Sequence, residues 1–212
     1  MNGFTLITSI VPHPDGEQIC QTANKAGAAG GTILMGTGTA TSFLAAALGL
    51  GDTQKDIVYQ IVPSQIKSQI IDSIRESCLN RKHYGILFTT TVSSFTKTAS
   101  TLKGDIPMEK ASTHKIITVI LNKGFAYDAM AAARKAGAAG GTILGGKGTA
   151  KEDDAKFFGV PIVPEKDILL ILAENEKTDS IINQIKSLSC LSEKGSGIIY
   201  TSDAADFTLL GK

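Results

Sequence analysis

The decapeptide KAGAAGGTIL occurs twice in this chain, at Lys25–Leu34 and unchanged at Lys135–Leu144. The similarity extends upstream, because FTLITSIV (Phe4–Val11) aligns with HKIITVIL (His114–Leu121). Short runs of β-branched and apolar residues of this kind predict strands. A repeat of this length requires that one structural unit be built twice.

Three further pairs of segments align downstream, with shifts of only one residue: Asp56–Val62 with Asp167–Ala173, Ser68–Arg75 with Asp179–Lys186, and Gly85–Thr89 with Gly197–Thr201. The first and third pairs are apolar runs that predict strands. The middle pair carries isoleucines at positions i, i+1 and i+4, which is typical of the buried stripe of an amphipathic helix. The chain is therefore a tandem duplication.

The decapeptide itself has a structural interpretation. Helices are expected at Asp15–Ala26 and Tyr127–Ala136, each followed by a glycine, Gly27 or Gly137. Glycine adopts the left-handed conformation that ends many helices, and small residues let a helix approach a sheet closely. We expect these two roles to explain most of the repeated glycines.

Each copy reads strand, helix, strand, strand, helix, strand. This order predicts an α+β fold with two ferredoxin-like (βαββαβ) domains in tandem, each an antiparallel four-stranded sheet with two helices on one face. The predicted bounds are 1–96 for copy 1, 97–113 for a linker and 114–212 for copy 2. Strands that are apolar on both faces need cover, so we expect a homo-oligomer, trimeric or pseudo-threefold.

Composition excludes several classes of function. The 212 residues carry a formal net charge of +1 with 6% aromatic residues, so nucleic acid is not an expected partner. Three cysteines without metal-ligand spacing favour reduced thiols. The N-terminus lacks the features of a secretory signal, and the longest apolar run, Ser42–Gly51, is half the length of a membrane span. A cytoplasmic location is expected.

Two pairs of loops are candidates for ligand binding. MGTGTA, with Gly36 and Gly38, aligns with GGKGTA, with Lys147, Gly148 and Thr149. Glycines free backbone N–H groups to form an anion-accepting concavity, and Lys147 adds a point charge. A plain turn is the alternative interpretation.

The second pair of loops precedes the last strand of each copy. CLNRKHYG contains Lys82, whereas CLSEKGSG contains Lys194, Gly195 and Gly197. Lysine together with glycine amides suits phosphate, although an exposed connection between helix and strand is the alternative. The second copy keeps more glycine, so we favour it as the ligand-binding copy.

These features resemble the P-II nitrogen-regulatory-like family. The resemblance is carried by KAGAAGGTILGGKGT, by the run Phe157–Lys186 and by the glycine-bearing loop before GIIYT. It implies a trimeric signal-transduction protein that binds ATP, ADP or AMP between subunits and regulates a partner such as a membrane transporter or a metabolic enzyme. The implied nucleotide contacts are Gly141, Thr142, Lys147, Gly148, Lys194, Gly195 and Gly197.

The connecting segments depart from the pattern of that family. Thr37–Lys55 and Lys147–Lys166 contain no tyrosine, so uridylylation is not implied. The apolar run Ser42–Leu50 is expected to pack inside the assembly, and insertion into a partner is the alternative.

We do not expect an enzyme. The sequence contains three histidines and no pairing of carboxylates or of histidine with cysteine that would suit acid–base or zinc chemistry. Two rival functions remain open. One is a metal-binding trimer of the divalent-cation-tolerance type, and the other is a structural oligomer without a ligand.

Overall fold

The computed structural model describes residues 3–39, 53–92, 95–97, 100–102, 112–148, 156–157, 160–161, 165–191 and 196–211. The chain divides into two compact units. Unit 1 comprises Met1–Met35, Gln54–His114 and Ser202–Lys212, and unit 2 comprises Gly36–Thr53 and Lys115–Thr201. The domain bounds expected from the sequence, 1–96 and 114–212 with a linker at 97–113, stay a prediction.

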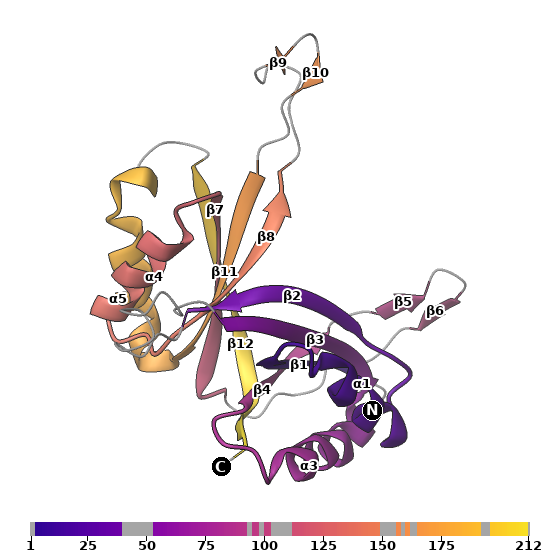
Figure 1. The fold of residues 1–212 in the computed structure, drawn as a ribbon. Coiled ribbons are helices and arrows are strands. Elements are labelled where there is room, and N and C mark those ends of the chain that lie inside the picture. Colours follow the sequence, from indigo (N-terminus) through magenta and orange to yellow (C-terminus); the bar gives the residue numbers. More distant parts are fainter. Residues whose placement is uncertain are drawn as a thin grey trace. The chain divides into compact units, whose positions relative to one another are not determined.

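The two copies contain matching elements (Figure 1). Copy 1 consists of β1 (Phe4–Pro12), α1 (Gly16–Lys25), β2 (Thr32–Gly38), β3 (Thr53–Pro63), the 3-10 turn η1 (Ser64–Ile66), α3 (Lys67–Cys78) and β4 (Gly85–Val92). Copy 2 consists of β7 (His114–Asn122), α4 (Ala126–Lys135), β8 (Thr142–Lys147), β11 (Glu165–Glu174), α5 (Asn175–Lys186), the 3-10 turn η2 (Ser189–Leu191) and β12 (Gly197–Leu210). Two short hairpins complete the set: β5 (Phe95–Lys97) with β6 (Ser100–Leu102), and β9 (Lys156–Phe157) with β10 (Val160–Pro161).

The prediction of two tandem ferredoxin-like domains with separate sheets is wrong. The eight long strands form one closed β-barrel, in the order β1-β3-β2-β8-β11-β7-β12-β4. The joins are made where β2 pairs with β8, as at Thr37 opposite Ile143, and where β12 pairs with β4, as at Leu210 opposite Gly85. The physical reason is that a separate four-stranded sheet has two edges with unpaired N–H and C=O groups, and pairing the edges removes both.

Unit 1 has its core between helices and strands. β1 pairs in antiparallel register with β3 and with β4, so that Ile7 lies opposite Gln60 on one side and Thr89 on the other. Isoleucines from α1 and α3 pack against the apolar residues of these strands. The largest fully buried members of this cluster are Ile7, Ile19, Ile70, Ile74 and Leu87.

Unit 2 repeats this arrangement. Helices α4 and α5 pack side by side and cover one face of the sheet formed by β7, β8 and β11 (Figure 1). Leu169 of β11 lies opposite Ile143 of β8. The fully buried side chains of this cluster include Ile117, Leu121, Met130, Leu169, Ile171 and Ile181.

The expected helix caps are confirmed in both copies. Gly27 has φ +107° and Gly137 has φ +95°, which places both in the left-handed region after α1 and α4. In both copies the following alanine donates its N–H back to the helix, as Ala28 does to the carbonyl of Ala23 over 3.0 Å. This glycine conformation ends the helix without strain.

The last glycine of each decapeptide lies where helix and sheet approach closely. A Cβ on Gly31 would lie 2.9 Å from Cγ of Gln60 and 3.0 Å from Sγ of Cys20. A Cβ on Gly141 would lie 2.9 Å from both Sδ of Met130 and the carbonyl oxygen of Leu170. The repeated decapeptide is thus explained by packing in both copies, as its structural interpretation predicts.

Two simpler expectations concern the chain as a whole. Cys20, Cys78 and Cys190 form no disulfide bond in the structure, and their reduced state stays a prediction. Within the described residues, no helix has both the length and the apolar character required to cross a membrane. The apolar run Ser42–Leu50 lies outside the described residues.

Candidate anion-binding site

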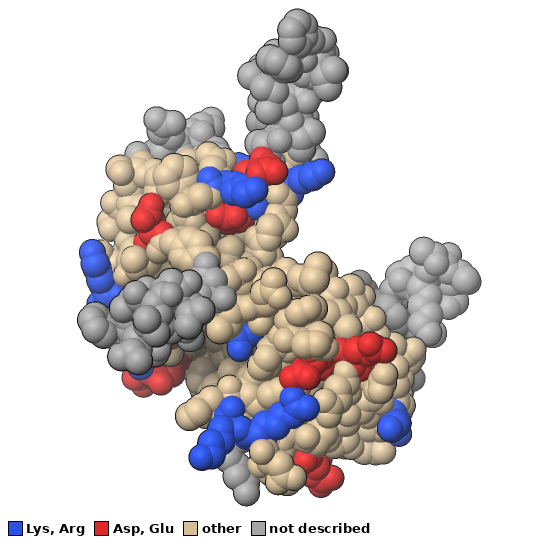
Figure 2. Space-filling model, in the orientation of Figure 1, with Lys and Arg blue, Asp and Glu red and all other residues tan. Residues whose placement is uncertain are grey.

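Three neighbouring strands of unit 2 place lysines at one end of the sheet. β7 ends just before Lys123, β8 ends at Lys147, and β11 begins with Glu165 and Lys166. The register puts Lys147 directly opposite Glu165, while the N–H of Lys123 donates to the carbonyl of Glu165 over 3.2 Å. Figure 2 shows basic and acidic side chains gathered where β8 and β11 meet at this end of unit 2.

A hollow of 270 Å³ lies among these strand ends. It is lined by Lys123, Gly145, Gly146, Lys147, Glu165 and Lys166. A Cβ built on Gly145 would meet no atom of the described residues within 4 Å, so there is open space beside this residue, whose backbone pairs with β11 opposite Asp167. Glycine backbone beside lysine ammonium groups suits the binding of an anion.

The charges around the hollow are unbalanced. Nζ of Lys123 contacts Oε2 of Glu165 at 2.5 Å, which raises the pKa of Lys123 and lowers the pKa of Glu165. Nζ of Lys166 donates to Oδ1 of Asn122 over 2.6 Å. Across the described part of the chain, Nζ of Lys147 contacts no carboxylate. Glu165 interacts electrostatically with both Lys123 and Lys147, and Asp167 interacts with Lys123, so three ammonium groups share two carboxylates and an excess of positive charge remains.

A buried carboxylate positions the turn that carries Lys123. Asp167 is 9% exposed, and its Oδ2 accepts the N–H of Gly124 over 2.8 Å. This hydrogen bond ties the turn after β7 to the start of β11. It is a positioning contact, because it fixes the distance between Lys123 and Lys166 without touching the hollow.

Some of the ligand-binding residues predicted in copy 2 lie at the end of the sheet that carries the hollow, and others do not. Lys147 lines the hollow, with Gly148 next to it. Gly197 begins β12 at the same end of the sheet, but β11 and β7 separate it from β8. A Cβ on Gly197 would lie 2.9 Å from the carbonyl oxygen of Ile120, so this glycine allows two strands to approach closely. Thr149, Lys194 and Gly195 lie outside the described residues.

Gly141 and Thr142 lie away from the hollow, at the opposite end of β8. The N–H of Gly141 donates to Oγ1 of Thr39 over 2.8 Å, and its carbonyl accepts the N–H and the hydroxyl of Thr39, each over 2.9 Å. Thr142 is 6% exposed at the start of the strand. The amide of Gly141 is therefore occupied by Thr39.

The copy 1 residues are divided between the units. Gly36 and Gly38 lie in β2, within unit 2, whereas Lys82 is an exposed residue of unit 1 in the loop before β4. They form no described cluster with the lysines of copy 2.

The residues that the sequence reasoning missed are Lys123, Lys166 and Glu165. Each is adjacent to an aligned strand, and a signal was present in the sequence. NKG follows the first strand of copy 2 where copy 1 has PHP, and EKD opens the later strand where copy 1 has QKD. Only the pairing of three strands shows that these positions meet.

Among the described residues, no group of three or more His, Cys, Asp or Glu side chains gathers as metal ligands do. No cluster of metal ligands among the described residues supports the metal-binding alternative, which stays a hypothesis for experiment.

No protein-family profile matches the chain, and no curated protein matches it in sequence. Among solved structures, Arabidopsis thaliana PII bound to citrate aligns at 20% identity and TM-score 0.34, covering 44% of this chain and 77% of that chain. A protein of unknown function from Galdieria sulphuraria aligns at 11% identity and TM-score 0.31, covering 95% of this chain and 98% of that one. A microcompartment protein from Desulfitobacterium hafniense aligns at 12% identity and TM-score 0.28, covering 94% of each chain. Alignments at this level describe a loose similarity of chain path and carry no inference about ligand or partner.

Proposed function

We propose that this protein is a P-II-like regulator that senses an adenine nucleotide, ATP, ADP or AMP, through copy 2. The phosphates bind in the hollow formed by Lys123, Lys147 and Lys166 around Gly145 and Gly146. The observation that supports this proposal is the excess of ammonium groups beside the open space at Gly145, where Lys147 forms no ion pair within 4 Å among the described residues.

The physical chemistry of the hollow favours phosphate. Lysine acts as a strongly hydrated point charge, and a phosphate oxygen accepts charge-assisted hydrogen bonds from several donors at once. The ion pair between Lys123 and Glu165 is exposed and therefore weak, so an incoming phosphate can compete with Glu165 for Lys123. The site is thus suited to reversible binding.

The position of the hollow also supports a regulatory role. Lys147 ends β8 and Glu165 begins β11, so the segment between them leaves and re-enters the sheet at the ligand. A ligand at this end of the sheet that has different affinity for two conformations of the protein changes their populations. We propose that this change alters contact with a partner protein, such as a transporter or a metabolic enzyme. No catalytic step is part of the proposal.

Assembly into a homo-oligomer, trimeric or pseudo-threefold, is a further part of this proposal and is tested by light scattering with and without nucleotide.

Calorimetric titration of the full chain with ATP, ADP and AMP tests the proposal. We expect one site per chain. Lys147→Thr, which installs the residue that aligns in copy 1, is expected to weaken binding about 10-fold, or about 1.4 kcal/mol, because one charge-assisted contact is lost. Lys135→Gln is the matched control, since Lys135 is exposed at the end of α4.

Two results would reject the proposal. One is the absence of heat with all three nucleotides, and the other is unchanged affinity in Lys147→Thr. Tight binding of a divalent metal without nucleotide binding would favour the divalent-cation-tolerance alternative, and no binding of either would favour a structural oligomer.

A further inference from the structure

A second hollow lies on the helix side of copy 2, between α5 and the first part of β12. Its volume is 420 Å³, and it is lined by Ile182, Lys186, Leu191, Gly197, Ile199, Tyr200 and Thr201. All of these residues belong to unit 2. A hollow of this size is within the range of small-ligand and side-chain pockets.

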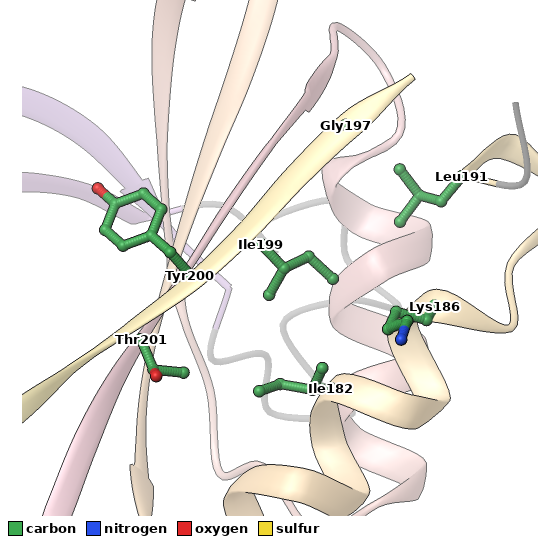
Figure 3. A pocket seen from close by; sticks show the side chains of 7 residues that line it. All are labelled: Ile182, Lys186, Leu191, Gly197, Ile199, Tyr200 and Thr201. Carbon is green, nitrogen blue, oxygen red and sulfur yellow. The ribbon is translucent and has the colours of Figure 1, made fainter. Parts of the chain in front are cut away.

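The hollow has an apolar wall on its inner side (Figure 3). Ile182 on α5 and Ile199 on β12 point toward one another, with Leu191 above them, whereas Tyr200 points to the other side of the strand. The three apolar side chains are only partly buried against the core of unit 2. An apolar side chain from outside would complete this layer.

The matching position in copy 1 is already filled by the end of the chain. Leu210 is 2% exposed and belongs to the same core cluster as Ile71 and Leu87, which align with Ile182 and Ile199. Ile71 is 8% exposed and Leu87 is 0% exposed. The segment that carries Leu210 thus gives copy 1 the cover that copy 2 lacks.

This cover is a strand pairing. Leu210 lies opposite Gly85 and Thr208 lies opposite Leu87 along β4, and the N–H of Tyr84 donates to the carbonyl of Leu210 over 3.0 Å. A Cβ on Gly211 would lie 2.4 Å from the carbonyl oxygen of Arg81, which shows how closely the tail packs.

The corresponding edge of β12 in copy 2 has no such strand among the described residues. β12 pairs with β4 in antiparallel register, with Ala205 opposite Thr89. If this register is continued toward the start of β12, Gly197–Thr201 lie opposite positions beyond Val92, where β4 has already ended. The next described strand, Phe95–Lys97, pairs with β6 in a separate two-stranded sheet.

None of the described residues fills this hollow from within the chain, and the sequence offers a reason. FTLLG at Phe207–Gly211 aligns with FTKTA at Phe95–Ala99, so Thr98 stands where Leu210 would be needed. The tail of a second copy does not serve this groove, because in each chain the FTLLG segment is paired with its own β4.

We propose that the hollow of copy 2 binds an extended segment of a different protein, which adds as a strand to the edge of β12 at Gly197–Thr201. Its main chain pairs with this edge, and a leucine or a similar apolar side chain enters the layer of Ile182, Leu191 and Ile199. Addition of a strand to a sheet edge, with a pocket for one side chain, is a recurrent mode of peptide recognition. The nearby ammonium of Lys186 favours an acidic residue in the partner segment.

The test uses a fluorescent peptide with the sequence DFTLLGK, which copies Asp206–Lys212, and measures its anisotropy with the full chain. We expect saturable binding. Ile199→Ser is expected to weaken binding at least 10-fold. Ile198→Ser is the matched control, because Ile198 is 62% exposed and neighbours Ile199 on the other face of the strand. Circular dichroism verifies that both variants are folded.

Two altered peptides need no change in the protein. Replacing the second leucine by alanine removes the side chain for the hollow, and methylating alternate amide nitrogens removes the strand hydrogen bonds. Both are expected to lose at least 10-fold in affinity.

Absence of binding, or equal binding by Ile199→Ser and the unchanged chain, would overturn the proposal. If Ile199→Ser unfolds, Ile182→Ser on the helix surface replaces it. Self-association in light scattering that depends on Ile199 would show that a second copy fills the groove, and would overturn the assignment to a different protein.

Discussion

The same end of the sheet is built differently in the two copies. The backbone contact is shared, since the N–H of His13 donates to the carbonyl of Gln54 over 3.1 Å, as Lys123 does to Glu165 over 3.2 Å. The side chains differ. Where copy 2 has Lys123 and Glu165, copy 1 has His13 and Gln54.

The remaining lysines follow the same trend. Lys147 aligns with Thr37, and Lys166 aligns with Lys55, whose pKa is lowered by burial. Imidazole Nδ1 of His13 lies 2.9 Å from Oδ1 of Asp56, so this side chain is engaged with a buried carboxylate. The comparison teaches that duplication kept the scaffold in both copies, while the exposed charge at the strand ends is concentrated in copy 2.

The largest expected effect comes from the glycine that opens the last strand of each copy. A Cβ on Gly85 would lie 2.2 Å from the carbonyl oxygen of Ile10, against 2.9 Å between a Cβ on Gly197 and the carbonyl oxygen of Ile120. Gly85→Ala is expected to lower the free energy of unfolding by about 3 kcal/mol and Gly197→Ala by about 2 kcal/mol, because backbone must move in each case. Urea denaturation measures both, and the reverse order would contradict the comparison.

The buried aspartates rank next. Asp56 accepts the N–H of Gly16 over 2.9 Å in addition to its contact with His13, whereas Asp167 accepts the N–H of Gly124. Asp56→Ala is expected to cost about 2 kcal/mol and Asp167→Ala about 1 kcal/mol, because the first leaves more polar groups unpaired. Equal losses in denaturation would show that the contact with His13 adds nothing.

The core of copy 1 contains polar atoms that copy 2 has replaced. Ser9 and Gln60 are 0% and 1% exposed, and their side-chain polar atoms have no hydrogen-bond partner within the described part of the structure. Val119 and Ile171 occupy the aligned positions. The double variant Ser9→Val, Gln60→Ile is expected to raise the free energy of unfolding by about 1 kcal/mol, since buried unpaired polar groups are removed. A loss of stability would mean that these groups have partners.

The smallest effect concerns Glu165. Because the pKa of Glu165 is lowered, its carboxylate stabilises the fold at pH values above the ordinary pKa of a glutamate. This stabilisation is lost as the pH falls through the lowered pKa. Because the pair with Lys123 is exposed, the contribution is small and screened by salt. The melting temperature of Glu165→Gln is expected to lie slightly below that of the unchanged chain at pH 7, and the difference is expected to shrink as the pH falls through the lowered pKa. A difference that does not shrink would point to packing instead of charge.

The local structure was predictable because its causes are local. Isoleucine spacing places the helices, and the repeated glycines place their ends, as Gly27 and Gly137 show.

The joins between copies were not predictable in the same way. β2 and β8 meet through main-chain pairs at Thr37 and Gly38, and main-chain hydrogen bonds leave no signature in side-chain identity. The same argument applies to the candidate site. Lys147 was found from its glycine neighbours, but Lys123 and Lys166 become part of the site only because β7 and β8 flank β11. Pairing of distant strands decides which charges gather.

The central claim is that copy 2, and not copy 1, presents the ligand-binding strand ends. Nuclear magnetic resonance of the ¹⁵N-labelled chain, titrated with ADP, tests it residue by residue. The account predicts that the amides of Gly145, Gly146 and Lys147 shift with a common affinity, while those of His13, Gln54 and Lys55 at the matching strand ends of copy 1 do not. Shifts confined to His13, Gln54 and Lys55, or no shift in either set, would contradict it.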